Sequence, residues 1–257
     1  MAPMAGYTKE PFSAALSSGH SITHDVYSQG NGPIVVIIQE LPGIGPETLK
    51  LADEFQSEGF RVVIPHLFGP LGKTALATNT LRVLCLRREF RMFQKGETSP
   101  IVDWLRALCQ QLKKEHPVSG VGVIGMCLTG NFAISLMADE AVLAGVASQP
   151  SLPVQHPADL HMSEADITDI RQRLDQHGPM LAYRFEGDSL CKADRFQEID
   201  AKFNHNRERV RLKTLPGKGH AVLTLDFVNQ QGHPTRQALN EVITYFRTAL
   251  TEDRGTN

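Results

Sequence analysis

The sequence predicts an α/β fold in which helices cover both faces of a mostly parallel sheet. Short runs of apolar, β-branched residues alternate with longer amphipathic segments along most of the 257 residues. Such alternation is typical of βαβ units, whose crossover connections make neighbouring strands parallel. The run Ile34–Ile38 is apolar throughout, as expected for a strand buried on both faces. We expect a single domain over residues 1–257, since this length suits one large α/β unit.

The individual elements follow from the hydrophobic pattern. Strands are expected at residues 34–38, 61–65, 121–125, 143–147, 180–185 and 209–215. Helices are expected at residues 47–58, 99–115, 128–140 and 235–250. The helix at 99–115 is the clearest, because Ile101, Leu105 and Leu108 recur at helical spacing. The polar residues before about 30 are expected to form an antiparallel edge of the sheet.

Two segments interrupt the strand–helix rhythm. Residues 68–97 are rich in arginine and leucine, and residues 150–178 begin with a loop rich in histidine and proline. Both leave the edge of the sheet where the parallel strands end, which is where open α/β folds bind ligands. We therefore interpret both segments as a cap or a pocket wall.

Composition and charge restrict the function classes. The chain is 41% hydrophobic, and its formal net charge of -2 argues against nucleic acid or an anionic membrane as the main partner. The cysteines show neither C-x-x-C spacing nor zinc-finger spacing to a histidine, so we expect no disulfide framework, no metal and no cofactor. No basic segment precedes an apolar one near the start, and no apolar run could span a bilayer, which predicts a soluble cytoplasmic protein.

The stretch Gly125-Met126-Cys127 lies where a strand runs directly into a helix, the context of a nucleophile elbow. Neighbours two positions before and after the nucleophile must be small; Gly125 meets this condition, and Thr129 meets it in part. The start of the helix favours a thiolate at Cys127, because its free N–H groups and dipole stabilise negative charge. The N–H of Leu128 is a candidate donor to an oxyanion.

The partners of such a nucleophile follow along the chain in the order acid, then histidine. Asp188 lies just after the expected strand 180–185, and His220 follows the strand 209–215 in a glycine-rich loop. His220 would take the thiol proton, and Asp188 would fix the tautomer of the imidazole. Glu186 and Asp194 remain alternatives for the acid. The other three cysteines are expected to be buried core residues: Cys85, Cys109 and Cys191.

Taken together, these motifs resemble the dienelactone hydrolase family of the α/β-hydrolase superfamily. The matching blocks are Gln39-Glu40-Leu41 with Gly43, Ala52–Phe55 to Pro65, Gly125–Leu128, Asp188–Cys191 and Pro216–His220. The resemblance covers about residues 33 to 246. It implies that Glu40 contacts the resting thiol and helps to convert it to thiolate, and that the N–H of Leu41 is a second oxyanion donor. From the residues alone, Glu40 could equally be solvated.

Three positions depart from the family pattern. Thr129 replaces the glycine that usually stands two positions after the nucleophile, and His66 stands where the family commonly has aspartate. Thr224 occupies the position of an arginine that, in the dienelactone enzymes, binds the substrate carboxylate. His66 is a candidate pocket residue. Three arginines elsewhere in the chain could bind a substrate carboxylate instead: Arg87, Arg88 and Arg91. The alternative is that they form the solvated face of a helix.

The sequence therefore predicts a hydrolase that cleaves a small ester or lactone through a Cys127-His220-Asp188 triad and an acyl-enzyme. One alternative is a non-catalytic small-molecule binder on the same fold, favoured by the departures at Thr129 and Thr224. Another is hydrolysis of a thioester or an activated amide by the same residues. The pattern leaves the physiological substrate and the oligomeric state open.

Overall fold

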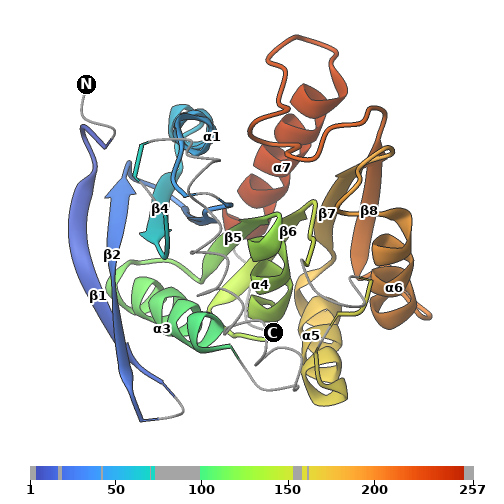
Figure 1. Ribbon diagram of the computed structural model, residues 1–257. Coiled ribbons are helices and arrows are strands. Elements are labelled where there is room, and N and C mark those ends of the chain that lie inside the picture. Colours follow the sequence, from blue (N-terminus) through green and yellow to red (C-terminus); the bar gives the residue numbers. More distant parts are fainter. Residues whose placement is uncertain are drawn as a thin grey trace.

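A computed structural model describes residues 4–16, 19–41, 43–69, 71–72, 99–152, 158–160 and 162–251. Its centre is an eight-stranded sheet with the strand order β1-β2-β4-β3-β5-β6-β7-β8 (Figure 1). The strands are β1 (Thr8–Ala15), β2 (Ser21–Gln29), β3 (Ile34–Ile38), β4 (Arg61–His66), β5 (Val121–Met126), β6 (Val142–Ser148), β7 (Met180–Phe185) and β8 (Val210–Leu215). The six neighbouring strands β4, β3, β5, β6, β7 and β8 are all parallel to one another. Strand β2 is antiparallel to both of its neighbours, β1 and β4.

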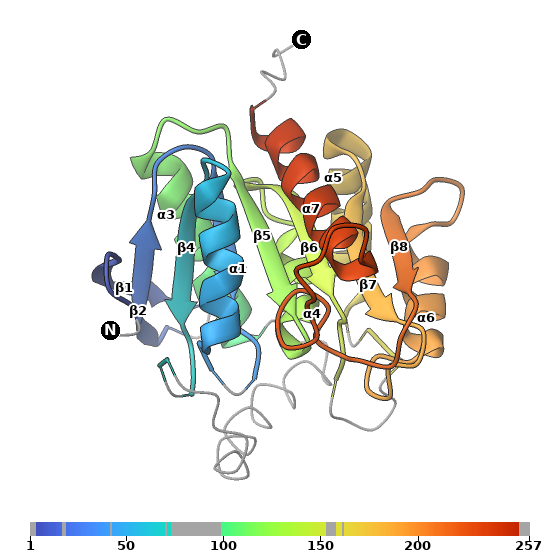
Figure 2. The ribbon, with the colours of Figure 1, turned by 90° about the horizontal axis from the view of Figure 1, so that it is seen from above.

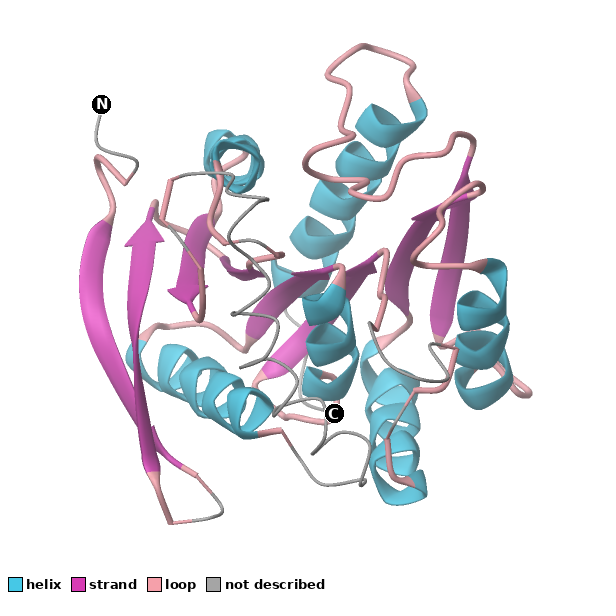
Figure 3. Ribbon diagram, viewed as in Figure 1, coloured by secondary structure: helices cyan, strands magenta, loops and turns pink. Residues whose placement is uncertain are grey.

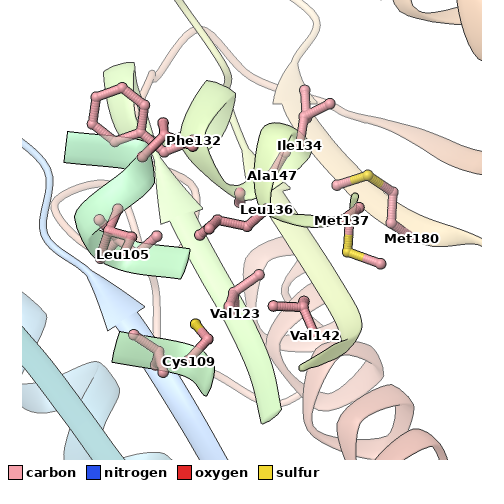
Figure 4. Close-up of a cluster of buried hydrophobic side chains, with 14 of the residues drawn as sticks. Leu105, Cys109, Val123, Phe132, Ile134, Leu136, Met137, Val142, Ala147 and Met180 are labelled. Atoms are coloured by element: carbon pink, nitrogen blue, oxygen red, sulfur yellow. The ribbon is translucent and has the colours of Figure 1, made fainter. Parts of the chain in front are cut away.

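Helices cover both faces of this sheet (Figures 2 and 3). One face carries α1 (Pro46–Ser57) and α7 (Pro234–Thr251), and the other carries α3 (Pro100–Glu115), α4 (Leu128–Leu136), α5 (Glu164–His177) and α6 (Ala193–Phe203). An apolar core lies on each face. Leu105 of α3 and Phe132 of α4 pack with Val123 of β5 in one core (Figure 4), and Phe55 packs with Phe246 in the other.

The order of the strands decides where a ligand would bind. The chain moves from β3 outward to β4, and then returns to place β5 on the other side of β3. This reversal is a topological switch point, at which the loops leaving two adjacent strands diverge and leave a crevice. Ile38 at the end of β3 is paired with Gly125 near the end of β5. The residues that follow both strands therefore lie beside each other.

The α/β class and the antiparallel edge agree with the sequence prediction, and most element boundaries lie within one or two residues of it. Two helices, α5 and α6, were not predicted. Helix α5 lies within the segment 150–178 and begins at a capping box of Ser163 and Asp166. Both helices are mostly polar, because each buries only one narrow apolar stripe. In α5 this stripe consists of Ile167, Ile170 and Leu174.

Helix α4 is shorter than expected, ending at Leu136 rather than near residue 140. Asp139 accounts for the early end, because its Oδ1 accepts a hydrogen bond of 2.8 Å from the N–H of Ala141 in the turn to β6. Gln110 of α3 donates to the other carboxylate oxygen at 2.7 Å. None of the helices in the described ranges is both long and apolar enough to cross a membrane.

Candidate active site

Cys127 lies at the tight turn between β5 and α4, as the sequence predicts. Its backbone has φ 55° and ψ −122°, a strained conformation for a residue with a side chain. A Cβ at Gly125 would come within 2.0 Å of the carbonyl oxygen of Thr129, so only glycine allows the strand and the helix to approach this closely. This geometry is that of a nucleophile elbow.

The threonine that departs from the family pattern has a structural role of its own. Thr129 is fully buried, and its hydroxyl accepts a hydrogen bond from the N–H of Met126 at 2.9 Å. The same hydroxyl lies 3.1 Å from the carbonyl oxygen of Ile38, to which it donates. Thr129 therefore ties the elbow to the end of β3, the strand that leads to Glu40.

The loops after β7 and β8 bring Asp188 and His220 together. Nδ1 of His220 lies 2.8 Å from Oδ2 of Asp188, whose side chain is fully buried. The other carboxylate oxygen accepts hydrogen bonds from the N–H groups of Leu190 at 2.8 Å and Cys191 at 3.0 Å. Burial alone would raise the pKa of Asp188, but these hydrogen bonds outweigh it and lower that pKa. The carboxylate form is thus favoured.

The alternative acids are not placed in the same way. Glu186 and Asp194 are both exposed, whereas Asp188 is buried and aimed at the imidazole. Of the three carboxylates considered, only Asp188 has a hydrogen bond to His220 within the described residues.

The other ring nitrogen of His220, Nε2, faces the sulfur of Cys127. Nε2 is buried and has no hydrogen-bond partner among the described residues other than the nearby sulfur of Cys127. Burial lowers the pKa of His220, but its interactions with Asp188 and with the sulfur of Cys127 outweigh this effect and raise the pKa to about 10. Nε2 thus lies close to the sulfur of Cys127, and the raised pKa makes this imidazole a strong base.

Glu40 lies at the end of β3 and is buried, with 6% of its surface exposed. Burial raises its pKa to about 7, although a hydrogen bond from Thr224 and the proximity of His220 both oppose the shift. The hydroxyl of Thr224 donates to Oε1 of Glu40. Glu40 is therefore not solvated. Thr224, which stands where the family has an arginine, is an uncharged hydrogen-bond donor to Glu40.

The two candidate oxyanion donors lie at the ends of the paired strands β3 and β5. Leu128 is the first residue of α4, so its N–H has no acceptor inside the helix. Leu41 follows Glu40 and is partly buried against the same apolar core as Cys127. Because Ile38 and Gly125 are partners in the sheet, these two N–H groups belong to adjacent loops at the switch point.

The remaining predicted residues lie elsewhere or outside the described part. His66 ends β4, where its Nε2 lies 2.9 Å from the carbonyl oxygen of Gly69, and it neighbours His24. No described contact joins His66 to Cys127 or His220. The candidate carboxylate ligands lie outside the described residues: Arg87, Arg88 and Arg91. Cys109 and Cys191 are buried, as predicted, and Cys85 is also outside the described residues.

Two residues of the site were not predicted. The hydroxyl of Ser151 lies 3.3 Å from the sulfur of Cys127. Gln149 is fully buried with φ 37°, and its Oε1 accepts a hydrogen bond of 3.3 Å from the N–H of Val222 in the histidine loop. Both follow the buried strand β6 at the edge where the other candidates lie. Polar residues directly after a buried strand were the signal that could have identified them.

No three His, Cys, Asp or Glu side chains of the described ranges are grouped so that they could hold a metal ion. The site consists instead of a thiol, an imidazole, a buried carboxylate and backbone N–H groups. Such a set can generate a nucleophile and stabilise a developing oxyanion.

The strand order, the elbow after β5 and the histidine in the loop after β8 define an α/β-hydrolase. The model of the Dienelactone hydrolase family matches residues 23–250, and the chain belongs to this family. It is accordingly a dienelactone hydrolase-like hydrolase. A search of curated proteins gave no significant match.

Solved structures support the same fold. A putative dienelactone hydrolase from Klebsiella pneumoniae is 15% identical, with a TM-score of 0.65 over 93% of this chain and 98% of that chain. A dienelactone hydrolase-like promiscuous phosphotriesterase from metagenomic libraries is 14% identical, with a TM-score of 0.65 over 96% of this chain and 100% of that chain. A cold-adapted esterase from an Arctic intertidal metagenomic library is 14% identical, with a TM-score of 0.60 over 96% of both chains.

Proposed function

We propose that the protein hydrolyses a small carboxylic ester or lactone, with Cys127 as nucleophile, His220 as general base and acid, and Asp188 as the residue that orients the imidazole. The observation that carries this proposal is the pairing of His220 with buried Asp188, which leaves Nε2 beside the thiol at a strained elbow. Family membership and the esterase among similar structures favour an ester bond as the target.

The first half of the reaction forms an acyl-enzyme. The thiol proton of Cys127 passes to Nε2 of His220, and the sulfur attacks the carbonyl carbon of the substrate. The N–H groups of Leu128 and Leu41 donate hydrogen bonds to the resulting oxyanion. When the tetrahedral intermediate collapses, the C–O bond breaks and the leaving oxygen takes the proton from Nε2.

The second half releases the acid. Nε2 of His220 removes a proton from water, and the hydroxide attacks the thioester carbon. Collapse of this second intermediate breaks the C–S bond and returns the proton to the sulfur, so the enzyme is regenerated without any external oxidant or reductant. Asp188 stabilises the imidazolium in both halves, which is consistent with the raised pKa of His220.

The charge of the site favours an uncharged acyl group. Thr224 supplies no positive charge, and it donates its hydroxyl to Glu40. A substrate carboxylate at this position would meet a buried acid that is partly ionised near neutral pH, since the pKa of Glu40 is raised to about 7. We therefore expect neutral esters and lactones to react faster than lactones that carry a carboxylate.

The test is hydrolysis of a panel of aryl esters, enol lactones and thioesters by the wild type and by Cys127→Ala. Loss of the nucleophile should lower kcat/KM by about 10³-fold or more. Cys109→Ala is the matched control, because Cys109 is buried in α3 away from the site and its loss should leave turnover in place.

Retention of most activity in Cys127→Ala would refute the proposed nucleophile. If folded wild-type protein turns over no member of the panel, the non-catalytic binder becomes the better description. The best substrate among the three classes would decide between an ester and a thioester.

A further inference from the structure

Ser151 lies in the loop after β6, with its hydroxyl 3.3 Å from the sulfur of Cys127. Only 6% of its surface is exposed. The Ser151 hydroxyl therefore contacts this sulfur directly, and Nε2 of His220 approaches the same atom.

The main chain holds Ser151 on the elbow. Its N–H donates to the carbonyl oxygen of Cys127 at 3.2 Å. Asn131, which is buried in α4, donates from Nδ2 to the carbonyl oxygen of Ser151 at 3.1 Å and to that of Leu128 at 3.0 Å. The same amide therefore fixes both the serine and the turn that carries the nucleophile.

A buried guanidinium stabilises this amide. Arg195 is 2% exposed and donates from Nη2 to Oδ1 of Asn131. Its Nη1 donates to the carbonyl oxygens of Ala158 at 3.0 Å and Asp159 at 2.5 Å. Burial lowers the pKa of Arg195 to about 10, so the side chain is still a cation at neutral pH. A positive charge thus lies one amide away from the loop that holds Ser151.

We propose that Ser151 is a further catalytic residue, whose hydroxyl donates a hydrogen bond to the ionised sulfur of Cys127 and stabilises the nucleophilic form. This inference rests on the proposed role of Cys127. An ionised sulfur cannot donate, so the hydroxyl must be the donor in that state. A hydrogen bond to a charged acceptor is about twice as strong as one between neutral groups, so the contact favours thiolate over thiol.

The opposite direction of the same contact has a different consequence. If the thiol donates to Ser151, the hydroxyl stabilises the neutral sulfur and slows its ionisation. The position of the serine favours the first direction, because the free N–H groups at the start of α4 also stabilise negative charge at this turn.

The test is the rate at which iodoacetamide alkylates Cys127 as a function of pH, measured by mass spectrometry of the peptide that contains it. Ser151→Ala removes one oxygen and keeps the main-chain hydrogen bonds, whereas Ser151→Thr keeps the hydroxyl. The exposed Ser119, at the opposite edge of the sheet, supplies the matched control Ser119→Ala. Circular dichroism verifies that each variant is folded.

We expect alkylation of Cys127 in Ser151→Ala to be about tenfold slower at neutral pH, as for loss of a hydrogen bond to a charged group, and its pH profile to move to higher pH. Ser151→Thr and Ser119→Ala should stay close to the wild type. Alkylation that is unchanged or faster in Ser151→Ala would overturn the proposal. Because alkylation needs no substrate, this result is separate from the ester panel, on which a failure of the proposed function would appear.

Discussion

The nucleophile elbow and the two loops that carry Asp188 and His220 are built in different ways. In the elbow, the contacts that shape the turn join residues within one short segment, Gly125 to Thr129 and Thr129 to Met126. One further hydrogen bond joins Thr129 to the carbonyl oxygen of Ile38. In the loops, the hydrogen bonds that bring separate loops together join residues far apart in the sequence. The pairs Asp188–His220, Gln149–Val222 and Glu40–Thr224 are separated by 32, 73 and 184 residues.

The candidate nucleophile is thus positioned mainly by local steric constraint, whereas the candidate acid and base meet through a tertiary contact. A strained φ at Cys127 persists because a strand and a helix close on either side of it. The acid loop is also braced locally, because the buried guanidinium of Arg184 donates to the carbonyl oxygens of Cys191 and Glu186, both at 2.9 Å. Its contact with the histidine loop is the tertiary one. Substitutions in the two regions should therefore fail in different ways.

The largest effect is expected at Gly125. The added methyl group of Gly125→Ala would lie 2.0 Å from a backbone oxygen, which no side-chain movement can relieve. We expect the free energy of unfolding to fall by about 3 kcal/mol, and ester hydrolysis to fall with it. Urea unfolding measures the loss of stability, and kcat/KM for an ester measures the loss of activity.

Gly59→Ala is the control for the elbow. Gly59 has φ +86°, but open space surrounds its missing side chain, so only the backbone strain of about 1 kcal/mol applies. Equal losses of stability in the two variants would show that the close approach at Gly125 is not the cause.

The next effect is expected at Asp188. Asp188→Asn keeps the shape of the side chain but removes the charge that raises the pKa of His220. We expect kcat/KM for a good ester to fall by about 10³-fold, with little change in the urea midpoint. Asp194→Asn should leave kcat/KM within about twofold, because Asp194 is exposed. A large loss in the second variant would assign the acid to Asp194.

Glu40 lies between the two regions, and its titration predicts a pH effect on stability. Its folded pKa of about 7 is above the usual glutamate value of 4.5, so the folded state binds more protons than the unfolded state between these pH values. The free energy of unfolding should fall as pH rises from about 4.5 to about 7, and then level off. The full contribution is about 3 kcal/mol.

Glu40→Gln should remove this part of the pH dependence, and Glu10→Gln, an exposed substitution on β1, should not. Urea unfolding at a series of pH values gives the comparison. Parallel curves for the wild type and Glu40→Gln would contradict the raised pKa.

The smallest effect is expected at Arg184. Arg184→Met keeps the bulk of the side chain but leaves the buried carbonyl oxygen of Cys191 without this donor. We expect a loss of about 2 kcal/mol in the free energy of unfolding and about a tenfold loss in kcat/KM, since the acid loop is loosened. Arg211→Met on the adjacent strand breaks only an exposed pair with Glu208, and should change stability by less than about 0.5 kcal/mol.

The sequence predicted the fold well where the pattern was strong. The strands Ile34–Ile38 and Met180–Phe185 have the predicted bounds, because fully apolar runs between polar loops mark buried strands clearly. Helices α5 and α6 were missed because each has only one narrow apolar stripe among charged residues, a weaker signal than that of α3.

The sequence alone determined the local part of the site. A strand, Gly125, Cys127 and a helix in immediate succession define the elbow, because steric limits over a few residues are visible in the residues themselves. The order of Asp188 and His220 after strand ends identified the candidate partners, although it left Glu186 and Asp194 open.

Which polar groups of separate segments meet depends on the complete fold. Ser151 beside the sulfur, Thr224 against Glu40 and Arg195 against Asn131 are contacts between segments that the sequence separates widely. Such contacts depend on the register and twist of the whole sheet, which no local pattern encodes. Steric and propensity effects act over a few residues and are therefore visible in the sequence. Hydrogen bonds between loops form only when the complete fold brings those loops together.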